Sequence, residues 1–252
     1  MRVHLRISLL LLVVAMSVFP LVGREASALD GTPVTAMAAV PDACEAPMEL
    51  EIGTPLTEAE IDPTTLDLDL LYIDILIPHH ETAVTMAGIA QSRSTRPEVV
   101  SLAAGIVAAQ TPEVEQLRTW REAWYSDVPA LSDAQLFAGL ETKAASPGAA
   151  GAPGLGELSM SGMDAGIATL CAETDVFDLE FIDEMVEHHT GAVLLSELVA
   201  AEAVHPEMAA FAQTVVDVQG AEIVTMLGWR DAWYGGYPNR VHGGDGTGTP
   251  TT

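Results

Sequence analysis

The chain has few basic residues. Its 252 residues include 10 lysines and arginines against 36 aspartates and glutamates, which gives a formal net charge of −26, and Lys143 is the only lysine. Proteins bind nucleic acids through basic side chains that neutralise phosphates, and anionic membrane surfaces attract the same side chains. The composition therefore argues against nucleic acid and against a membrane surface as partners.

Aromatic residues and cysteines are also scarce. Aromatic side chains make up 5% of the chain, whereas alanine, valine and leucine are plentiful, and this balance favours helices over a β-sandwich. Two cysteines, Cys44 and Cys171, are too few for a cysteine-rich zinc site or a disulfide scaffold. They can pair with each other if the protein is exported, and the sequence leaves that possible disulfide open.

The common catalytic motifs are missing as well. The chain has no glycine-rich phosphate loop with a lysine and no Gly-x-Ser-x-Gly elbow. It also has no His-Glu-x-x-His helix and no Cys-x-x-Cys pair. These absences argue against P-loop hydrolases, α/β-hydrolases, zinc proteases of that motif and dithiol oxidoreductases.

The N-terminus has the layout of a secretory signal peptide. Arg2 and Arg6 precede the apolar run 7–19, and the small residues Ala-Ser-Ala at 26–28 follow it. This order predicts export with cleavage after Ala28. The alternative is an uncleaved anchor, but the apolar run is short for a membrane span. We expect a periplasmic, cell-surface or secreted protein with no membrane attachment after cleavage.

The rest of the chain contains an internal repeat. Residues 69–80, with the sequence DLLYIDILIPHH, reappear 109 positions later as DLEFIDEMVEHH at residues 178–189. The same offset holds without a gap to the sequences WREAWY at 120–125 and WRDAWY at 229–234. Compositional bias alone cannot maintain such a register, so we interpret the chain as two tandem copies of one unit.

Each copy is predicted to form a helical hairpin. The polar breaks before Pro97 and Pro206 separate the helices, which are expected at about 67–91, 97–124, 176–203 and 206–233. Two tandem hairpins predict an all-α, ferritin-like four-helix bundle with an approximate two-fold axis. The expected segments are a signal peptide (1–28), a poorly ordered N-terminal segment (29–55), the first hairpin repeat (56–125), a Gly/Ala/Pro-rich linker (126–170), the second hairpin repeat (171–234) and a disordered tail (235–252).

Polar residues recur on the inward face of every predicted helix. At roughly 100° per residue, each copy directs a histidine, a glutamine, a glutamate and an arginine toward the core, with an aspartate nearby. These residues are His80, Gln110, Glu113, Arg121 and Asp69 in the first copy, and His189, Gln219, Glu222, Arg230 and Asp178 in the second. Asp74 and its counterpart Asp183 repeat too, but the wheel directs Asp74 to solvent. Ionised groups on an inward face are costly unless they are paired or bound to metal.

Two interpretations can satisfy these inward groups. In the first, His80 and His189 bind one or two cations together with Glu113 and Glu222, near the bundle axis. Gln110 and Gln219 are then ligands or partners of the ligands, and His79 and His188 join from the flank. In the second, the histidines donate to the glutamates in a metal-free network. A His-His pair matched with glutamate in both copies favours metal. For Arg121 and Arg230 we expect structural ion pairs with Asp69 and Asp178 under either interpretation.

Nearby methionines favour copper among the metals that imidazole binds. Imidazole suits copper, zinc, iron and nickel, while a thioether shifts the preference toward copper. Met185 lies one turn before His188 and His189, and Met86 follows His79 on the same flank. The first copy has Leu76 where the second has Met185, so the two sites need not be equivalent. Copper is therefore the expected ion, with zinc or iron as alternatives.

The second copy resembles a known family. Residues 177–193, with Met160 and Met163 upstream and the pattern Gln219-x-x-Glu222-Ile-x-x-Met226 downstream, resemble the family called domain of unknown function 305, and 69–117 resembles a more divergent copy. The resemblance implies a ferritin-like helical fold, export by bacteria and a relationship to periplasmic copper-binding proteins linked to copper resistance. It also implies metal ligands at His79, His80, Met86, Met185, His188 and His189.

We therefore predict an exported copper-binding protein that serves in copper buffering or resistance. One alternative is a metal-dependent oxidoreductase with two nearby metals, which needs bridging carboxylates and an open coordination position. Glu113 and Glu222 are the only evident candidates for such bridges, so the sequence favours binding over catalysis. The other alternative is a metal-free structural or interaction module with the histidines in a buried network.

Overall fold

The computed structural model describes residues 44, 62, 65–145 and 160–237, all within one compact unit that begins at Ala39. The predicted signal peptide lies outside the described residues. So do nearly all of the predicted N-terminal segment, part of the predicted linker and most of the predicted tail.

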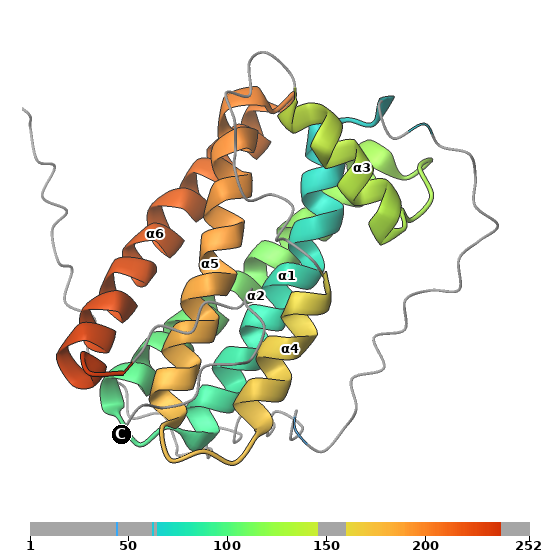
Figure 1. Cartoon of the computed structure of the whole chain (residues 1–252). Coiled ribbons are helices and arrows are strands. Elements are labelled where there is room, and N and C mark those ends of the chain that lie inside the picture. Colours follow the sequence, from blue (N-terminus) through green and yellow to red (C-terminus); the bar gives the residue numbers. More distant parts are fainter. Residues whose placement is uncertain (1–43, 45–61, 63–64, 146–159, 238–252) are drawn as a thin grey trace, which may run out of the picture. The chain divides into compact units, whose positions relative to one another are not determined.

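The described residues form helices and no strands, which confirms the all-α prediction (Figure 1). The helices are α1 (Leu68–Arg93), α2 (Pro97–Tyr125), α3 (Asp133–Ala144), α4 (Met160–Cys171), α5 (Phe177–Glu202) and α6 (Pro206–Tyr234). Helices α1 and α2 form one hairpin, α5 and α6 form another, and α1 packs against α5 between them. Among these helices, none has the length and hydropathy that crossing a bilayer requires.

Local sequence signals place the helix starts. The Asp67 side chain caps α1 by accepting a hydrogen bond from the backbone N–H of Asp69. Pro97 and Pro206 occupy the first position of α2 and α6, where the missing N–H costs no helical hydrogen bond. Pro78 lies inside α1 without ending it. The four hairpin helices consequently begin and end within one or two residues of the sequence-predicted bounds.

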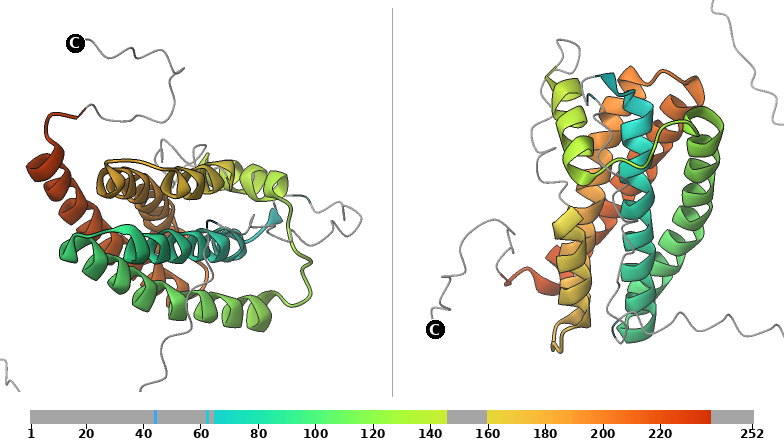
Figure 2. Two further views of the ribbon diagram at one scale, coloured as in Figure 1. Left: turned by 90° about the horizontal axis from the view of Figure 1, so that it is seen from below. Right: turned by 90° about the vertical axis from the view of Figure 1, so that its right-hand side faces the viewer.

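Two helices occupy the segment predicted to be a linker, so that prediction is wrong for much of 126–170. Helix α3 begins with a capping box in which Ser132 and Gln135 bond to each other's backbone N–H groups, and it buries Leu136 and Leu140. Helix α4 runs alongside α1 and α5, as Figure 2 shows. Both helices are short, and the Gly/Ala/Pro-rich sequence next to them made their helical periodicity hard to recognise. The remaining linker residues, 146–159, lie outside the described part of the chain.

The two hairpins match each other at the offset seen in the sequence. Helices α5 and α6 begin and end 109 positions after α1 and α2. Two apolar clusters form the core. Along α1, residues up to Leu76 belong to one cluster and residues from Ala83 on to the other, whereas along α5 the order is reversed. Helices α1 and α5 are therefore antiparallel, and the segments around 79–80 and 188–189 lie between the clusters.

The arginine partners differ from the predicted ones. Arg121 pairs with Asp74 (Nε–Oδ1 2.7 Å) rather than with Asp69, and Arg230 pairs with Asp183 (2.6 Å) rather than with Asp178. A bundle helix has one inward face toward its hairpin partner and another toward the second hairpin. Five residues turn the helix by roughly 140°, so Asp74 and Asp69 lie on different faces. The helix wheel merged these two directions into one.

Asp69 and Asp178 instead join the two hairpins at the ends of the bundle. The Asp69 carboxylate accepts hydrogen bonds from the backbone N–H groups of Val204 and His205 and contacts His205 Nδ1 at 2.8 Å. Asp178 pairs with Arg96 at 3.2 Å. Arg96 and His205 are counterparts at the 109-residue offset, and each lies against a tryptophan of the other hairpin, Trp233 and Trp124 respectively. The same joint thus occurs twice, once with an arginine and once with a histidine.

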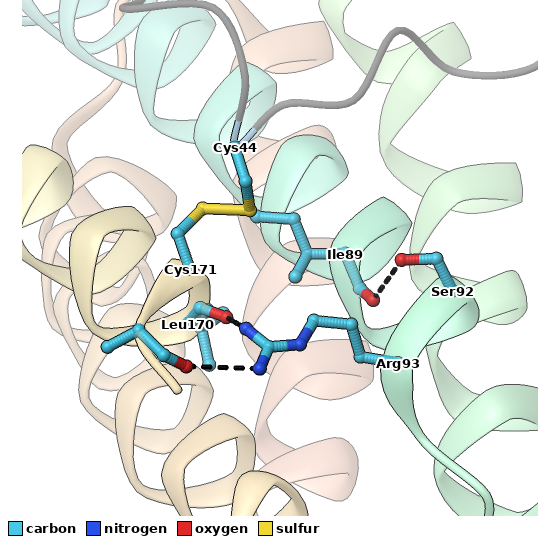
Figure 3. The surroundings of a disulfide bond; sticks show 7 residues. Cys44, Ile89, Ser92, Arg93, Leu170 and Cys171 are labelled. Carbon is cyan, nitrogen blue, oxygen red and sulfur yellow. Dashed lines mark hydrogen bonds between the residues drawn. A yellow bond between two sulfur atoms is a disulfide. The ribbon is translucent and has the colours of Figure 1, made fainter. Parts of the chain in front are cut away.

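A disulfide joins Cys44 to Cys171 at the end of α4, with the two Cα atoms 5.3 Å apart (Figure 3). Next to it, the Arg93 guanidinium at the end of α1 donates to the carbonyl oxygens of Leu170 and Ala172. The end of α4 is therefore held covalently to the chain preceding α1 and by hydrogen bonds to α1 itself.

One buried hydrogen bond of the core joins two residues whose counterparts at the 109-residue offset cannot form it. Tyr72 Oη and Ser196 Oγ lie 2.7 Å apart, and their counterparts are the buried apolar pair Phe181 and Ala87. We expect Tyr72→Phe to lower the free energy of unfolding by about 1–3 kcal/mol, because it leaves the Ser196 hydroxyl buried without this partner. Adding Ser196→Ala should recover most of the loss, measured by urea denaturation. A double variant less stable than Tyr72→Phe contradicts this expectation.

The disulfide should stabilise the fold by constraining the unfolded chain. Its cysteines are 127 residues apart, and a cross-link that closes a long loop removes much conformational entropy from the unfolded state. Replacing Cys44 and Cys171 together by serine should lower the free energy of unfolding by about 2–4 kcal/mol. Thermal unfolding with and without reductant checks this, since reductant should shift the midpoint of the wild-type protein and not that of the variant.

Candidate metal centre

Four histidines gather in one buried layer where α1 and α5 cross. His79, His80, His188 and His189 have relative exposures of 5%, 0%, 9% and 0%. Adjacent histidines point apart, with ring centroids 6.3 Å apart in the first pair and 6.1 Å in the second. The rings of His79 and His188 lie against each other, with centroids 3.7 Å apart. Because these two are counterparts at the 109-residue offset, the approximate two-fold axis passes between their rings.

His80 and His189 instead face the second helix of their own hairpin. The distance from His80 Nε2 to Glu113 Oε2 is 3.1 Å, and that from His189 Nε2 to Glu222 Oε2 is 2.9 Å. Only the second contact has hydrogen-bond geometry. The glutamate side chains are 22% and 16% exposed, whereas both histidines are fully buried. In each pair the histidine therefore lies in the interior and the glutamate lies closer to the surface.

Several buried polar atoms in this layer lack a well-aligned hydrogen bond within the described part of the chain. They are both ring nitrogens of His80 and of His188, the Nδ1 atoms of His79 and His189, and the Oε1 atoms of Gln110 and Gln219. Buried polar atoms without partners are rare because each costs free energy. Each neutral imidazole has one nitrogen with a free lone pair, and each amide has an oxygen, that can bind a metal ion, so the residues present fit a bound cation.

Burial keeps the central imidazoles neutral. Desolvation, reinforced by the neighbouring imidazoles, holds the pKa of His79 and of His188 well below the usual 6.5. Burial also lowers the pKa of His80, against the opposing effect of Glu113. Neutral imidazole is the form that ligates metal. The layer therefore presents ligands that need not lose a proton at neutral pH.

A pocket between α2 and α6 leads toward the layer from outside. It is lined by four pairs of counterparts: Ile106 and Val215, Ala109 and Val218, Gln110 and Gln219, and Glu113 and Glu222. It therefore lies on the approximate two-fold axis. Its glutamates are the partners of His80 and His189, so an ion in this pocket meets carboxylate and amide oxygens before imidazole.

Met86 and Met185 lie on the same side of the histidine layer. Met86 and Met185 are both buried in the apolar cluster that also contains Met226. A Cβ atom on Gly166 of α4 would lie 3.8 Å from Met86 Sδ and 3.3 Å from Glu184 Oε2, so α4 packs closely over this side. The sequence associated Met86 and Met185 with different histidine pairs, whereas the fold gathers them together. The side chains of Met160 and Met163 lie outside the described residues.

The predicted site residues thus assemble only in part. Among the described residues, no group of three or more His, Cys, Asp or Glu side chains converges as a metal-binding cluster. In this arrangement an ion would need further ligands from amide, thioether or water. Sequence reasoning missed the buried carboxylates Glu180 and Glu184, whose counterparts are the apolar Leu71 and Ile75. That difference between the copies was the signal available for them.

Comparison with known proteins identifies relatives of this fold. The family model described as "Domain of unknown function (DUF305)" matches residues 69–230. The solved structure of CopM in the Cu(I)-bound form is 28% identical over 66% of this chain and 97% of that one, with a TM-score of 0.51. A DUF305 protein from Streptomyces coelicolor is 22% identical over 64% of this chain and 90% of its own, also with a TM-score of 0.51, and shares the fold. No curated protein matches the chain.

The lowered pKa values predict a specific acid sensitivity. In the unfolded chain His79 and His188 take up protons near pH 6.5, whereas in the folded protein they remain neutral to lower pH. The free energy of unfolding should therefore fall as the pH drops below 6.5, by about 1.4 kcal/mol per pH unit for each such ring. Replacing both by glutamine should flatten this slope between pH 6.5 and 5 in urea titrations with chelator present. His205→Gln, outside the layer, is the control, and an unchanged slope in the double variant contradicts the assignment.

Proposed function

Because the chain belongs to the DUF305 family, we propose that it is an exported copper-binding protein whose ion is held at the histidine layer. The observation that carries this proposal is a layer of four buried imidazoles with unpartnered nitrogens, two of which face glutamates that lead to a pocket. The likeness to a Cu(I)-bound protein over nearly the whole length of that protein supports it.

The proposed ligands divide into three groups. His79 and His188 supply neutral nitrogens at the axis, where their own hydrogen-bonding needs are unmet. His80 and His189 supply imidazole beside Glu113 and Glu222, which offset the charge of the cation. Thioether sulfur comes from Met86 and Met185, and amide oxygen from Gln110 and Gln219. Thioether together with imidazole favours copper over zinc or iron.

The role that suits this arrangement is copper buffering or resistance. The histidines are almost completely shielded from solvent, so an ion bound among them is withdrawn from solution. Each glutamate of the pocket faces its own histidine, which supports sequestration by separate side chains rather than an oxidase centre built on bridging carboxylates. The signal-like sequence at 1–28 supports a periplasmic, cell-surface or secreted location.

We also propose that the two hairpins are tandem copies of one DUF305-like unit. The matched helix bounds support this, as do the repeated His–Glu and Arg–Asp contacts. Contacts that recur at one constant offset are expected when a duplicated hairpin folds back on its copy around a two-fold axis.

Metal analysis of the full exported chain tests the function. The protein is incubated with equal concentrations of copper, zinc and iron, desalted and measured by elemental analysis. We expect copper to be retained in stoichiometric amount and to be lost, roughly tenfold or more, in the variant His188→Ala/His189→Ala. His205→Ala is the matched control, since this histidine lies at the bundle end. Circular dichroism reports whether each variant is folded.

Two results would overturn the proposal. If the protein binds no metal under any condition, the interpretation as a metal-free helical module is correct instead. Equal copper retention by the wild type and by the folded double variant places the ion elsewhere.

A further inference from the structure

The two apolar clusters of the core are counterparts at the 109-residue offset, but they differ in one systematic way. The cluster around Leu76, Leu117 and Leu195 is called the leucine cluster here. The cluster around Met185, Met226 and Met86 is called the methionine cluster. At the offset, Leu76 corresponds to Met185, Leu117 to Met226 and Leu195 to Met86. All six side chains are buried.

Packing does not explain this segregation. Leucine and methionine have similar volume and hydrophobicity, and exchanges between them are among the best tolerated in protein cores. Met208 of the leucine cluster, which corresponds to Val99, shows that methionine can also fill that side. At the three positions above, however, every methionine is on one side. The property that differs is sulfur, which is a soft metal ligand. Three thioethers therefore lie on one side of the histidine layer, at positions where the other side has only hydrocarbon.

Helical spacing places this sulfur next to the layer. Met185 precedes His189 by four residues on α5, and Met226 follows Glu222 by four residues on α6, so each lies one turn from a member of the His189–Glu222 contact. Met86 reaches the same cluster from α1. Sulfur from three different helices thus lies in one cluster on one side of the imidazole-bearing layer.

The methionine side also has the means to balance a positive charge. Glu184 Oε2 and Met86 Sδ both lie within 4 Å of the position that a Gly166 Cβ would occupy. The Glu184 side chain is buried, and its counterpart in the first copy is the apolar Ile75. A buried cation is costly unless an opposite charge is near. Thioethers and imidazoles are neutral ligands, and thioether sulfur favours Cu(I), which is a monovalent ion.

We infer that the bundle has a single soft-metal site, on the methionine side of the histidine layer, for one monovalent ion such as Cu(I). The site uses the thioethers of Met86, Met185 and Met226 with imidazole from the layer, and Glu184 balances the charge. This inference rests on the proposed copper-binding function and adds to it the side, the oxidation state and the number of soft ions. The leucine side has no equivalent site.

Silver(I) is a suitable probe because it is soft, monovalent and stable in air. Isothermal titration of the full exported chain should show one tight silver equivalent. The variant Met86→Leu/Met185→Leu/Met226→Leu should lose this equivalent or bind it roughly tenfold or more weakly. Met208→Leu is the matched control, because Met208 is a buried methionine of the leucine cluster. Circular dichroism verifies that the variants fold.

A second measurement needs no variant. In protein labelled with ¹³C at the methionine methyl groups, one silver equivalent should shift the signals of Met86, Met185 and Met226 and leave that of Met208 in place. Absence of silver and copper binding by the wild type overturns the proposed function itself. Silver binding that is equally tight in the folded triple variant, or that shifts none of the three signals, overturns this inference and leaves the proposed function standing.

Discussion

The structure depends on burying four imidazoles at the point where α1 and α5 cross. Polar rings in the middle of an apolar core cost free energy, since water can no longer solvate them. The rings respond by remaining neutral, and two of them gain a carboxylate neighbour at the edge of the layer. His79 and His188 gain only each other. A core built in this way contains buried nitrogens without hydrogen-bond partners, which is the feature on which the proposed metal binding rests.

The same layer divides the hydrophobic core into two halves. Each half draws on both hairpins, because antiparallel α1 and α5 exchange sides at the histidines. The halves consist largely of residues that correspond at the 109-residue offset, but their chemistry differs. One is hydrocarbon throughout the positions next to the layer, and the other has sulfur and the buried carboxylate Glu184. The two halves of the core therefore differ in the side chains that they place at matched positions.

Much of this arrangement could be read from the sequence, because it depends on local periodicity and on a visible repeat. The helices of both hairpins and the facing of His80 toward Glu113 follow from spacing alone. The pairing of Arg121 with Asp74 did not follow, since a helix wheel gives one inward direction and a bundle helix has two. Nor did the gathering of Met86 with Met185, which requires knowing that the two central helices cross in opposite directions. Both features depend on how the helices pack against one another, which the hydrophobic periodicity of a single helix does not encode.

The position of the axis between His79 and His188 has a consequence for how such a molecule can diverge. Away from the axis, the two members of each matched pair have different neighbours, and each is free to change alone, as leucine and methionine have done. On the axis, His79 and His188 are counterparts and also direct neighbours. A change in one ring alters the surroundings of the other, so these two positions constrain each other. Where two matched hairpins meet on their axis, a substitution in one hairpin therefore also changes the environment of its counterpart in the other.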